Sequence, residues 1–188
     1  MHMKQITLLT EAFKNLKTVG TITFSSKFLV KNIVAPIDFN KARCIVELGA
    51  GDGCITKALL EKMHPDAVLI SFEINDKFCE IIKKEVNDKR LHLICDSAEK
   101  IGEYLNLYGF EKADFIVSSV PLVVLPKEIA RNIEKEVTKT LKSGGIFVHL
   151  SYSPLQLKKF EKLFSSVKLH FTLLNMPPAF VYICRQAA

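Results

Sequence analysis

The sequence predicts an α/β fold, in which a mostly parallel sheet of seven strands carries helices on both faces and ends in an antiparallel hairpin. From residue 43 onward, short apolar runs alternate with amphipathic stretches of helical period. Five such pairs follow one another, as expected for parallel strands joined by helical crossovers. Only a short segment with the pair Pro177-Pro178 separates the last two apolar runs, so those runs predict a hairpin.

The elements follow from this alternation. The expected strands are 43–48, 67–73, 90–95, 113–118, 145–151, 166–174 and 179–184, and the expected helices between them are 54–64, 76–87, 98–107, 126–142 and 154–164. Residues 4–17 predict one more helix, because apolar side chains recur there at helical spacing beside three lysines: Ile6, Leu9, Phe13 and Leu16, with Lys4, Lys14 and Lys17. We therefore expect residues 1–35 to form an amphipathic helix and a segment covering the ligand cleft, and residues 36–188 to form a single domain.

Composition narrows the choice of protein class. No apolar run reaches the ~18 residues that span a bilayer, and the N-terminus lacks the pattern of a signal peptide. These features predict a cytoplasmic protein. The five cysteines show no metal-binding spacing, so we expect no metal and reduced thiols within the core. The net charge of +6 favours an anionic partner, either nucleic acid or an anionic membrane surface.

Residues 47–53, Glu-Leu-Gly-Ala-Gly-Asp-Gly, form a glycine-rich turn between the first strand and helix. Glycines there let the backbone approach a ligand closely. Glu73 ends the next strand, where a carboxylate can accept hydrogen bonds from both ribose hydroxyls of a nucleoside. A dinucleotide site would read G-x-G-x-x-G, and Glu47 would repel a diphosphate, whereas it suits a ligand with an ammonium and a sulfonium. The alternative is a turn that only allows close helix packing.

This turn resembles the first motif of the class I S-adenosylmethionine-dependent methyltransferases, which have a Rossmann-like seven-stranded sheet. The resemblance implies S-adenosylmethionine as cofactor and S-adenosylhomocysteine as product. Ile74 is then expected to pack on the adenine, and Asp96 with Ser97 to meet its amino group. Asp96 as a simple helix N-cap is the alternative.

Three further segments resemble the bacterial phospholipid N-methyltransferases: 18–29, which begins Thr-Val-Gly and includes Ser25-Ser26; 118–122, Ser-Ser-Val-Pro-Leu; and 175–182, Asn-Met-Pro-Pro-Ala-Phe-Val-Tyr. Two positions depart from that family, because Phe24 stands in place of proline and Ser119 in place of glycine. The resemblance implies phospholipid N-methylation, with the amine of phosphatidylethanolamine as acceptor. The expected cofactor-binding residues are Thr18, Gly20, Ser25, Ser26, Glu47, Gly49, Ala50, Gly51, Gly53, Glu73, Ile74, Asp96, Ser97 and Ser118.

A lipid acceptor implies contact with a membrane. The basic N-terminal helix is expected to lie on an anionic surface, which would make the protein peripheral on the inner face of the membrane. The same helix could instead pack as a lid over the cofactor cleft. The sequence predicts no particular oligomeric state.

Methyl transfer requires little catalytic assistance from the protein, because the sulfonium is already activated and the nucleophile must only be held in line with it. An amine must first lose its proton. We expect the loop from Ser118 through Ser119 to Pro121 to position the amine, and Tyr152, Ser119 or the Ser118 carbonyl to take the proton. For Tyr152 the alternative is simple aromatic packing at the strand end.

Two other functions stay open. The segment Ser26-Lys27-Phe28-Leu29 and the glycine-rich turn also resemble the ribosomal RNA adenine dimethyltransferases. Those enzymes carry Asn/Asp-Pro-Pro-aromatic after the fourth strand, where this chain has Ser-Val-Pro-Leu. The third reading is a module that binds the cofactor without turnover.

Overall fold

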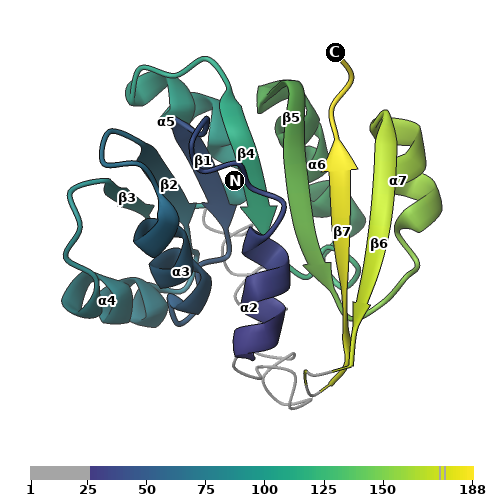
Figure 1. The fold of residues 1–188 in the computed structure, drawn as a ribbon, viewed down its shortest axis with the longest axis horizontal. Helices are drawn as coiled ribbons and strands as arrows, with labels where there is room; N and C mark the ends of the chain where they lie inside the picture. Colours follow the sequence, from purple (N-terminus) through teal and green to yellow (C-terminus); the bar gives the residue numbers. More distant parts are fainter. Residues whose placement is uncertain (1–25, 174, 176) are drawn as a thin grey trace.

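A computed structural model describes residues 26–173, 175 and 177–188 of the protein (Figure 1). Seven strands form one sheet in the order β3-β2-β1-β4-β5-β7-β6. Strands β1 to β5 are mutually parallel, and β7 runs antiparallel to both β5 and β6. The predicted fold class, a mostly parallel sheet with an antiparallel C-terminal hairpin, is confirmed.

The strands begin and end close to the expected positions: β1 (Cys44–Leu48), β2 (Val68–Phe72), β3 (Leu91–Ile94), β4 (Ala113–Ser118), β5 (Leu141–Ser151), β6 (Ser166–Thr172) and β7 (Ala179–Arg185). The helices are α2 (Lys27–Val34), α3 (Cys54–Lys62), α4 (Asp76–Glu85), α5 (Ile101–Leu107), α6 (Lys127–Thr140) and α7 (Leu157–Leu163), and a short 3₁₀ turn, η1 (Ala98–Lys100), precedes α5. Within the described part of the chain, no helix has the length and apolarity that a membrane span requires.

Two apolar layers cover the sheet because alternate strand residues point to opposite faces. On one face, Leu29 of α2 and Leu59 of α3 pack with Ile45 and its neighbours. On the other face, residues of α5, α6 and α7, among them Ile133 and Phe160, pack with the opposite set of strand residues. In Figure 1, α2 and α3 lie in front of the sheet and α6 lies behind it.

Helix α2 was not predicted. It begins after Ser26, whose hydroxyl oxygen accepts a hydrogen bond from the backbone N–H of Leu29 at 3.2 Å. Its apolar residues bury one side against α3, and Asn32 Nδ2 donates to Thr172 Oγ1 at 2.9 Å, which ties the helix to the end of β6. The helix expected at residues 4–17 lies outside the described residues.

The carboxyl ends of the parallel strands meet at one edge of the sheet. Leu48 pairs with Phe72 on one side and with Ser118 on the other, and Ser118 pairs with His149. The loops that follow β1, β2, β4 and β5 therefore leave the sheet side by side. In open α/β sheets this edge is where ligands bind.

Candidate functional site

The glycine-rich turn after β1 has a backbone that only glycine adopts easily. Gly49, Gly51 and Gly53 have φ angles of 79°, 56° and 80°, which lie in the left-handed region. The N–H groups of Gly49 and Ala50 both donate to the Phe72 carbonyl, at 2.8 and 3.0 Å. A Cβ built on Gly51 meets nothing within 4 Å, so this glycine borders open space, whereas a Cβ on Gly49 would lie 3.1 Å from Ser119 Oγ.

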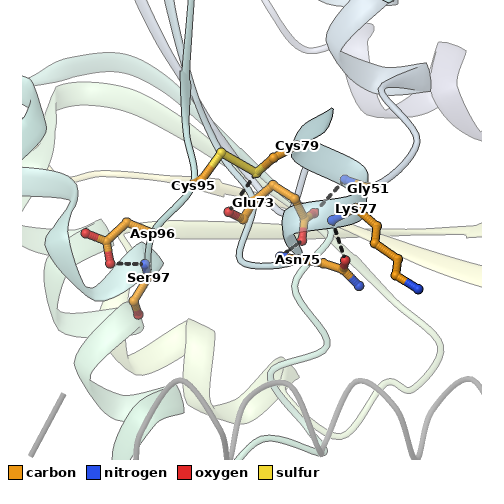
Figure 2. The surroundings of a disulfide bond; sticks show 8 residues. All are labelled: Gly51, Glu73, Asn75, Lys77, Cys79, Cys95, Asp96 and Ser97. Atoms are coloured by element: carbon orange, nitrogen blue, oxygen red, sulfur yellow. Dashed lines mark hydrogen bonds between the residues drawn. A yellow bond between two sulfur atoms is a disulfide. The ribbon is translucent and has the colours of Figure 1, made fainter. Parts of the chain in front are cut away.

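Glu73 lies directly beside this turn (Figure 2). One carboxylate oxygen accepts a hydrogen bond from Gly51 N at 2.7 Å, and the other accepts from Asn75 N at 2.8 Å. The side chain is buried, and this burial raises the pKa of Glu73, although the backbone donors oppose the shift. Each carboxylate oxygen can accept a second hydrogen bond. The structure therefore holds Glu73 rigidly, with acceptor capacity left for two ligand hydroxyls.

Asp96 and Ser97 follow β3 on the far side of the same cleft. Asp96 accepts hydrogen bonds from Ser97 N at 2.7 Å, Lys100 Nζ at 2.7 Å and Tyr104 OH at 3.0 Å. Burial opposes ionisation, but these donors outweigh it and keep the pKa of Asp96 below its ordinary value. The N-cap of the following turn is Ser97, not Asp96, because Ser97 Oγ accepts from Glu99 N. The N-cap alternative for Asp96 is therefore wrong.

These residues line an open cleft, and the roughly 350 Å³ of empty space in it includes the solvent at its mouth. Five expected residues come together there: Gly49, Glu73, Ile74, Asp96 and Ser97. Five apolar lining residues were not predicted: Phe72, Ala98, Val120, Leu125 and Ile133. Their place on the apolar sides of β2, η1 and α6, and in the loop after β4, made them look like ordinary core. The cleft thus has carboxylates along its lining and an apolar floor that suits a planar base.

The remaining expected cofactor residues are placed as follows. Ala50 is buried within the turn, and Gly53 is the N-cap of α3. Ser26 caps α2, and its N–H donates to Asn175 Oδ1 at 3.0 Å. Thr18, Gly20 and Ser25 lie outside the described residues.

Glu47 does not line the cleft but lies buried beneath the glycine-rich turn, only 1% exposed. Its Oε2 accepts hydrogen bonds from Thr56 Oγ1 at 2.7 Å and Ser71 Oγ at 2.6 Å, which connects β1 to α3 and β2. Its Oε1 has no hydrogen-bond partner among the described residues. Burial raises the pKa of Glu47 to about 7. A buried oxygen of this kind is costly unless a ligand or water completes its bonding.

The loop after β4 is fastened to the glycine-rich turn. Ser119 Oγ donates to the Gly49 carbonyl at 2.5 Å, and Ser119 N donates to the Leu48 carbonyl at 2.9 Å. Ser118 is buried, and its Oγ accepts from Val120 N at 3.3 Å. The Pro121 carbonyl accepts from Val124 N at 3.0 Å, which tightens the loop further. Hydrogen bonds therefore hold the loop that was expected to position the acceptor, and the Ser119 hydroxyl already donates its proton to the Gly49 carbonyl.

Behind this loop, His149 is fully buried on β5 among Phe147, Phe160 and Tyr182. Its Nε2 lies 3.1 Å from Gln156 Oε1, and burial lowers the pKa of His149 to about 4. The ring is therefore neutral at pH 7 and supports the loop after β5. Tyr152, in that loop, is 38% exposed and does not line the cleft.

A disulfide joins Cys79 of α4 to Cys95 at the end of β3, with Cα atoms 6.2 Å apart (Figure 2). The expectation of reduced cysteines is therefore wrong for this pair, whereas Cys44 and Cys184 are buried thiols. Cys79 Sγ also lies 3.5 Å from the Glu73 carbonyl oxygen, and Cys95 directly precedes Asp96. The sequence spacing of the cysteines could not predict this disulfide, because the pairing depends on how helix α4 packs against the end of β3.

Comparisons with known proteins agree with this geometry. Residues 45–145 match the family model described as a methyltransferase domain. The chain is 31% identical over 175 residues to an ornithine lipid N-methyltransferase of Singulisphaera acidiphila, with 92% of this chain and 91% of that protein covered. It is 28% identical to ribosomal RNA small subunit methyltransferase A of Mycoplasma mycoides subsp. mycoides, over 64% of this chain but only 45% of that protein.

Among solved structures, the O-methyltransferase TomG from Streptomyces achromogenes, in complex with SAM, superimposes with a TM-score of 0.69. That alignment covers 96% of this chain and 90% of TomG at 14% identity, a level at which it shows a shared fold.

Proposed function

Because the chain belongs to the methyltransferase domain family and is an S-adenosylmethionine-dependent methyltransferase, we propose that it methylates the amine of a membrane lipid, with phosphatidylethanolamine as the acceptor. One observation carries this proposal. The lipid N-methyltransferase relative is similar over nearly the whole of both chains, whereas the ribosomal RNA methyltransferase relative is matched over less than half of its own length.

The residues of the cleft fit S-adenosylmethionine, which supplies an activated methyl group when bound. We expect Glu73 to accept hydrogen bonds from the two ribose hydroxyls through the acceptor capacity that its backbone donors leave. Ile74 and the apolar lining would hold the adenine, with Asp96 and Ser97 at its polar edge. Glu47 lies buried beneath the glycine-rich turn, where a positively charged ligand above the turn would favour its ionised form.

The acceptor amine would meet the loop from Ser118 to Pro121. Because Ser119 holds this loop against Gly49, backbone groups there can orient the amine without rearranging during the reaction. A lipid ammonium has a pKa of about 10, so it must be deprotonated, and removal from water beside a cationic sulfonium favours the neutral amine. The proton of the ammonium would pass to water, and the neutral amine would then donate a hydrogen bond to a nearby oxygen. The candidates for that oxygen are the Ser118 carbonyl and Tyr152, which follows β5 at the same edge without lining the cleft, since the Ser119 hydroxyl already donates to Gly49.

The experiment is methyl transfer from labelled S-adenosylmethionine to four separate acceptors: vesicles with phosphatidylethanolamine, vesicles with ornithine lipid, vesicles with phosphatidylcholine alone, and ribosomal RNA. We expect label in the phosphatidylethanolamine vesicles and none in phosphatidylcholine alone. Label only in ornithine lipid would keep the lipid amine and replace the headgroup. Label only in RNA would overturn the proposal.

The ribosomal RNA alternative has one observation in its favour, the likeness to ribosomal RNA small subunit methyltransferase A. Against it stands the loop after β4. That loop reads Ser-Val-Pro-Leu and offers no aromatic ring to stack on a flipped base and no Asn or Asp side chain to hold its amino group. The RNA arm of the experiment addresses this function directly.

A further inference from the structure

Six large apolar side chains are exposed in the loops and strand end beside the cleft. Their exposed fractions range from 38% to 78%, and we call them the rim residues: Val123, Val124, Tyr152, Leu155, Phe171 and Leu173. Single exposed apolar residues are ordinary on protein surfaces, whereas several gathered on one edge mark an interaction site.

Strand direction places all six at the same edge. Val123 and Val124, the first pair, follow β4. Tyr152 and Leu155, the second pair, follow β5, and these two strands are parallel neighbours. Phe171 and Leu173, the third pair, lie at the end of β6. Phe171 is the register partner of Phe180 in β7, and Phe180 is the register partner of Ser151 at the end of β5. In Figure 1 the ends of β4, β5 and β6 all point downward. The cleft opens at this edge, because Val120 and Leu125, which flank the first pair, line it.

The segments that carry the rim residues are well anchored. Val124 N donates to the Pro121 carbonyl at 3.0 Å, and Leu155 N donates to Ser153 Oγ at 3.3 Å. The Ser153 carbonyl also accepts from the buried Tyr182 hydroxyl at 2.9 Å, and the rings of Phe171 and Phe180 lie 4.9 Å apart. Contacts within the fold therefore hold the segments of Val124, Leu155 and Phe171 in place, with these apolar side chains exposed.

Positive charge surrounds the rim residues. Lys27 begins α2, Lys127 begins α6 and Lys158 lies in the first turn of α7, and all three are exposed at this edge. Phe28, also in the first turn of α2, is 58% exposed and extends the apolar area. Acids also lie at this edge: Glu128 directly follows Lys127, Asp76 begins α4 after β2, and Asp52 lies in the glycine-rich turn. Apolar tips ringed by lysines match an anionic bilayer, in which the tips enter the acyl region and the lysines stay at the phosphates.

We propose that the rim residues and these three lysines form the surface by which the protein docks on an anionic lipid bilayer. Docking in this orientation brings the mouth of the cleft against the headgroups, so that a lipid amine reaches the loop after β4 while its acyl chains stay in the membrane. The inference rests on the proposed lipid acceptor. It assigns membrane contact to the folded domain itself, in addition to any contribution from residues 1–25.

The first test is sedimentation of the full chain with vesicles of phosphatidylethanolamine and phosphatidylglycerol. The double variant Leu155→Ser/Leu173→Ser should partition about tenfold more weakly or worse, because two exposed leucines lose their transfer into the interface. The matched control is Leu107→Ser, which removes a leucine that is 70% exposed at the end of α5, near the opposite edge of the sheet. That variant should bind like the unchanged protein.

The second test separates charge from apolar contact. Lys127→Gln/Lys158→Gln should weaken binding to the anionic vesicles several-fold and reduce its dependence on salt. Lys139→Gln, at the other end of α6, should leave both unchanged. Methylation of a short-chain phosphatidylethanolamine dispersed as monomers should be the same in all variants, because docking is not needed there.

Each outcome decides the inference. Equal vesicle binding by the rim variants and the unchanged protein would overturn it. A fall from dimer to monomer in light scattering without loss of vesicle binding would show that a second copy covers the rim. A large drop in melting temperature would show that the chain's own N-terminal segment covers it, and both results overturn the docking surface. Rim-dependent vesicle binding without methylation of any lipid would refute the proposed acceptor and leave the docking surface standing.

Discussion

Replacing Glu47 with glutamine should remove a large pH dependence from the stability of the protein. Glu47 is buried, and its pKa rises from 4.5 to about 7 on folding because burial disfavours the charged form. The folded protein therefore binds this proton more tightly than the unfolded chain does. Stability from this group is complete below pH 4.5 and is lost as the pH rises through about 7.

The magnitude follows from the shift. A rise from 4.5 to about 7 corresponds to about 3 kcal/mol, most of which falls between pH 5 and pH 8. In the Glu47→Gln variant, the amide oxygen can still accept from Thr56 and Ser71. The amide nitrogen takes the place of the unpartnered Oε1, at a cost of about 1–3 kcal/mol that does not depend on pH.

The assay is urea unfolding of the cofactor-free protein at pH 5, 6.5 and 8. The difference in unfolding free energy, variant minus unchanged protein, should rise by about 2–3 kcal/mol from pH 5 to pH 8. Other groups, such as His149, make the same pH-dependent contribution in both proteins, so that contribution cancels in this difference. Glu61→Gln, an exposed position on α3, is the control and should give a flat difference. Parallel profiles for the Glu47 variant would refute the buried, partly protonated carboxyl.

Three further predictions concern the same site. Glu73→Ala should weaken binding of S-adenosylmethionine and S-adenosylhomocysteine about 100-fold by calorimetry, because the two charge-assisted hydrogen bonds proposed to the ribose hydroxyls are lost. The control, Glu80→Ala at an exposed position, should bind both ligands normally. Ser119→Ala should cost about 0.5–1.5 kcal/mol of stability and lower kcat more than cofactor affinity, because the loop after β4 loses its bond to Gly49. Cys95→Ser should lower unfolding stability by about 3 kcal/mol under oxidising conditions, since the bridge closes a loop over a sequence separation of 16.

Each of these has a result that contradicts it. Unchanged calorimetric affinity in the Glu73 variant would mean that the ribose lies elsewhere. A Ser119 variant with normal kcat and stability would show that the contact with Gly49 does not hold the loop. The Cys95 variant should equal the unchanged protein once a reductant is added. A difference that persists in reductant would assign the effect to packing instead of the bridge.

Much of the fold was predictable because parallel strands and their crossover helices leave a local signal. The expected strand 113–118 agrees with β4 to the residue, and the hairpin followed from the short link through Pro177-Pro178. Helix α2 was missed because it has few turns and is stabilised by contacts with α3 and the end of β6, which a local pattern does not contain. The start of β5 at Leu141 was missed for a similar reason, since the strand continues through Gly144-Gly145 beside a register shift in β4.

The candidate site divides in the same way. Glu73, Ile74 and Asp96 were predictable, because each follows a strand and therefore lies at the carboxyl edge. The burial of Glu47 beneath the turn, the contact of Ser119 with Gly49 and the Cys79–Cys95 bridge were not. Each of these depends on two segments that are distant in sequence and meet only when the sheet is assembled.

Residue order alone specified the alternation of strands and helices, the glycine-rich turn and the carboxylates after the strands, because backbone conformation and strand polarity are local properties. The folded chain decided which side chains share a hydrogen bond, which carboxyl loses its charge and which apolar residues stay exposed together at the mouth of the cleft. These are properties of distance and burial, and a linear pattern carries neither until the strands are placed side by side.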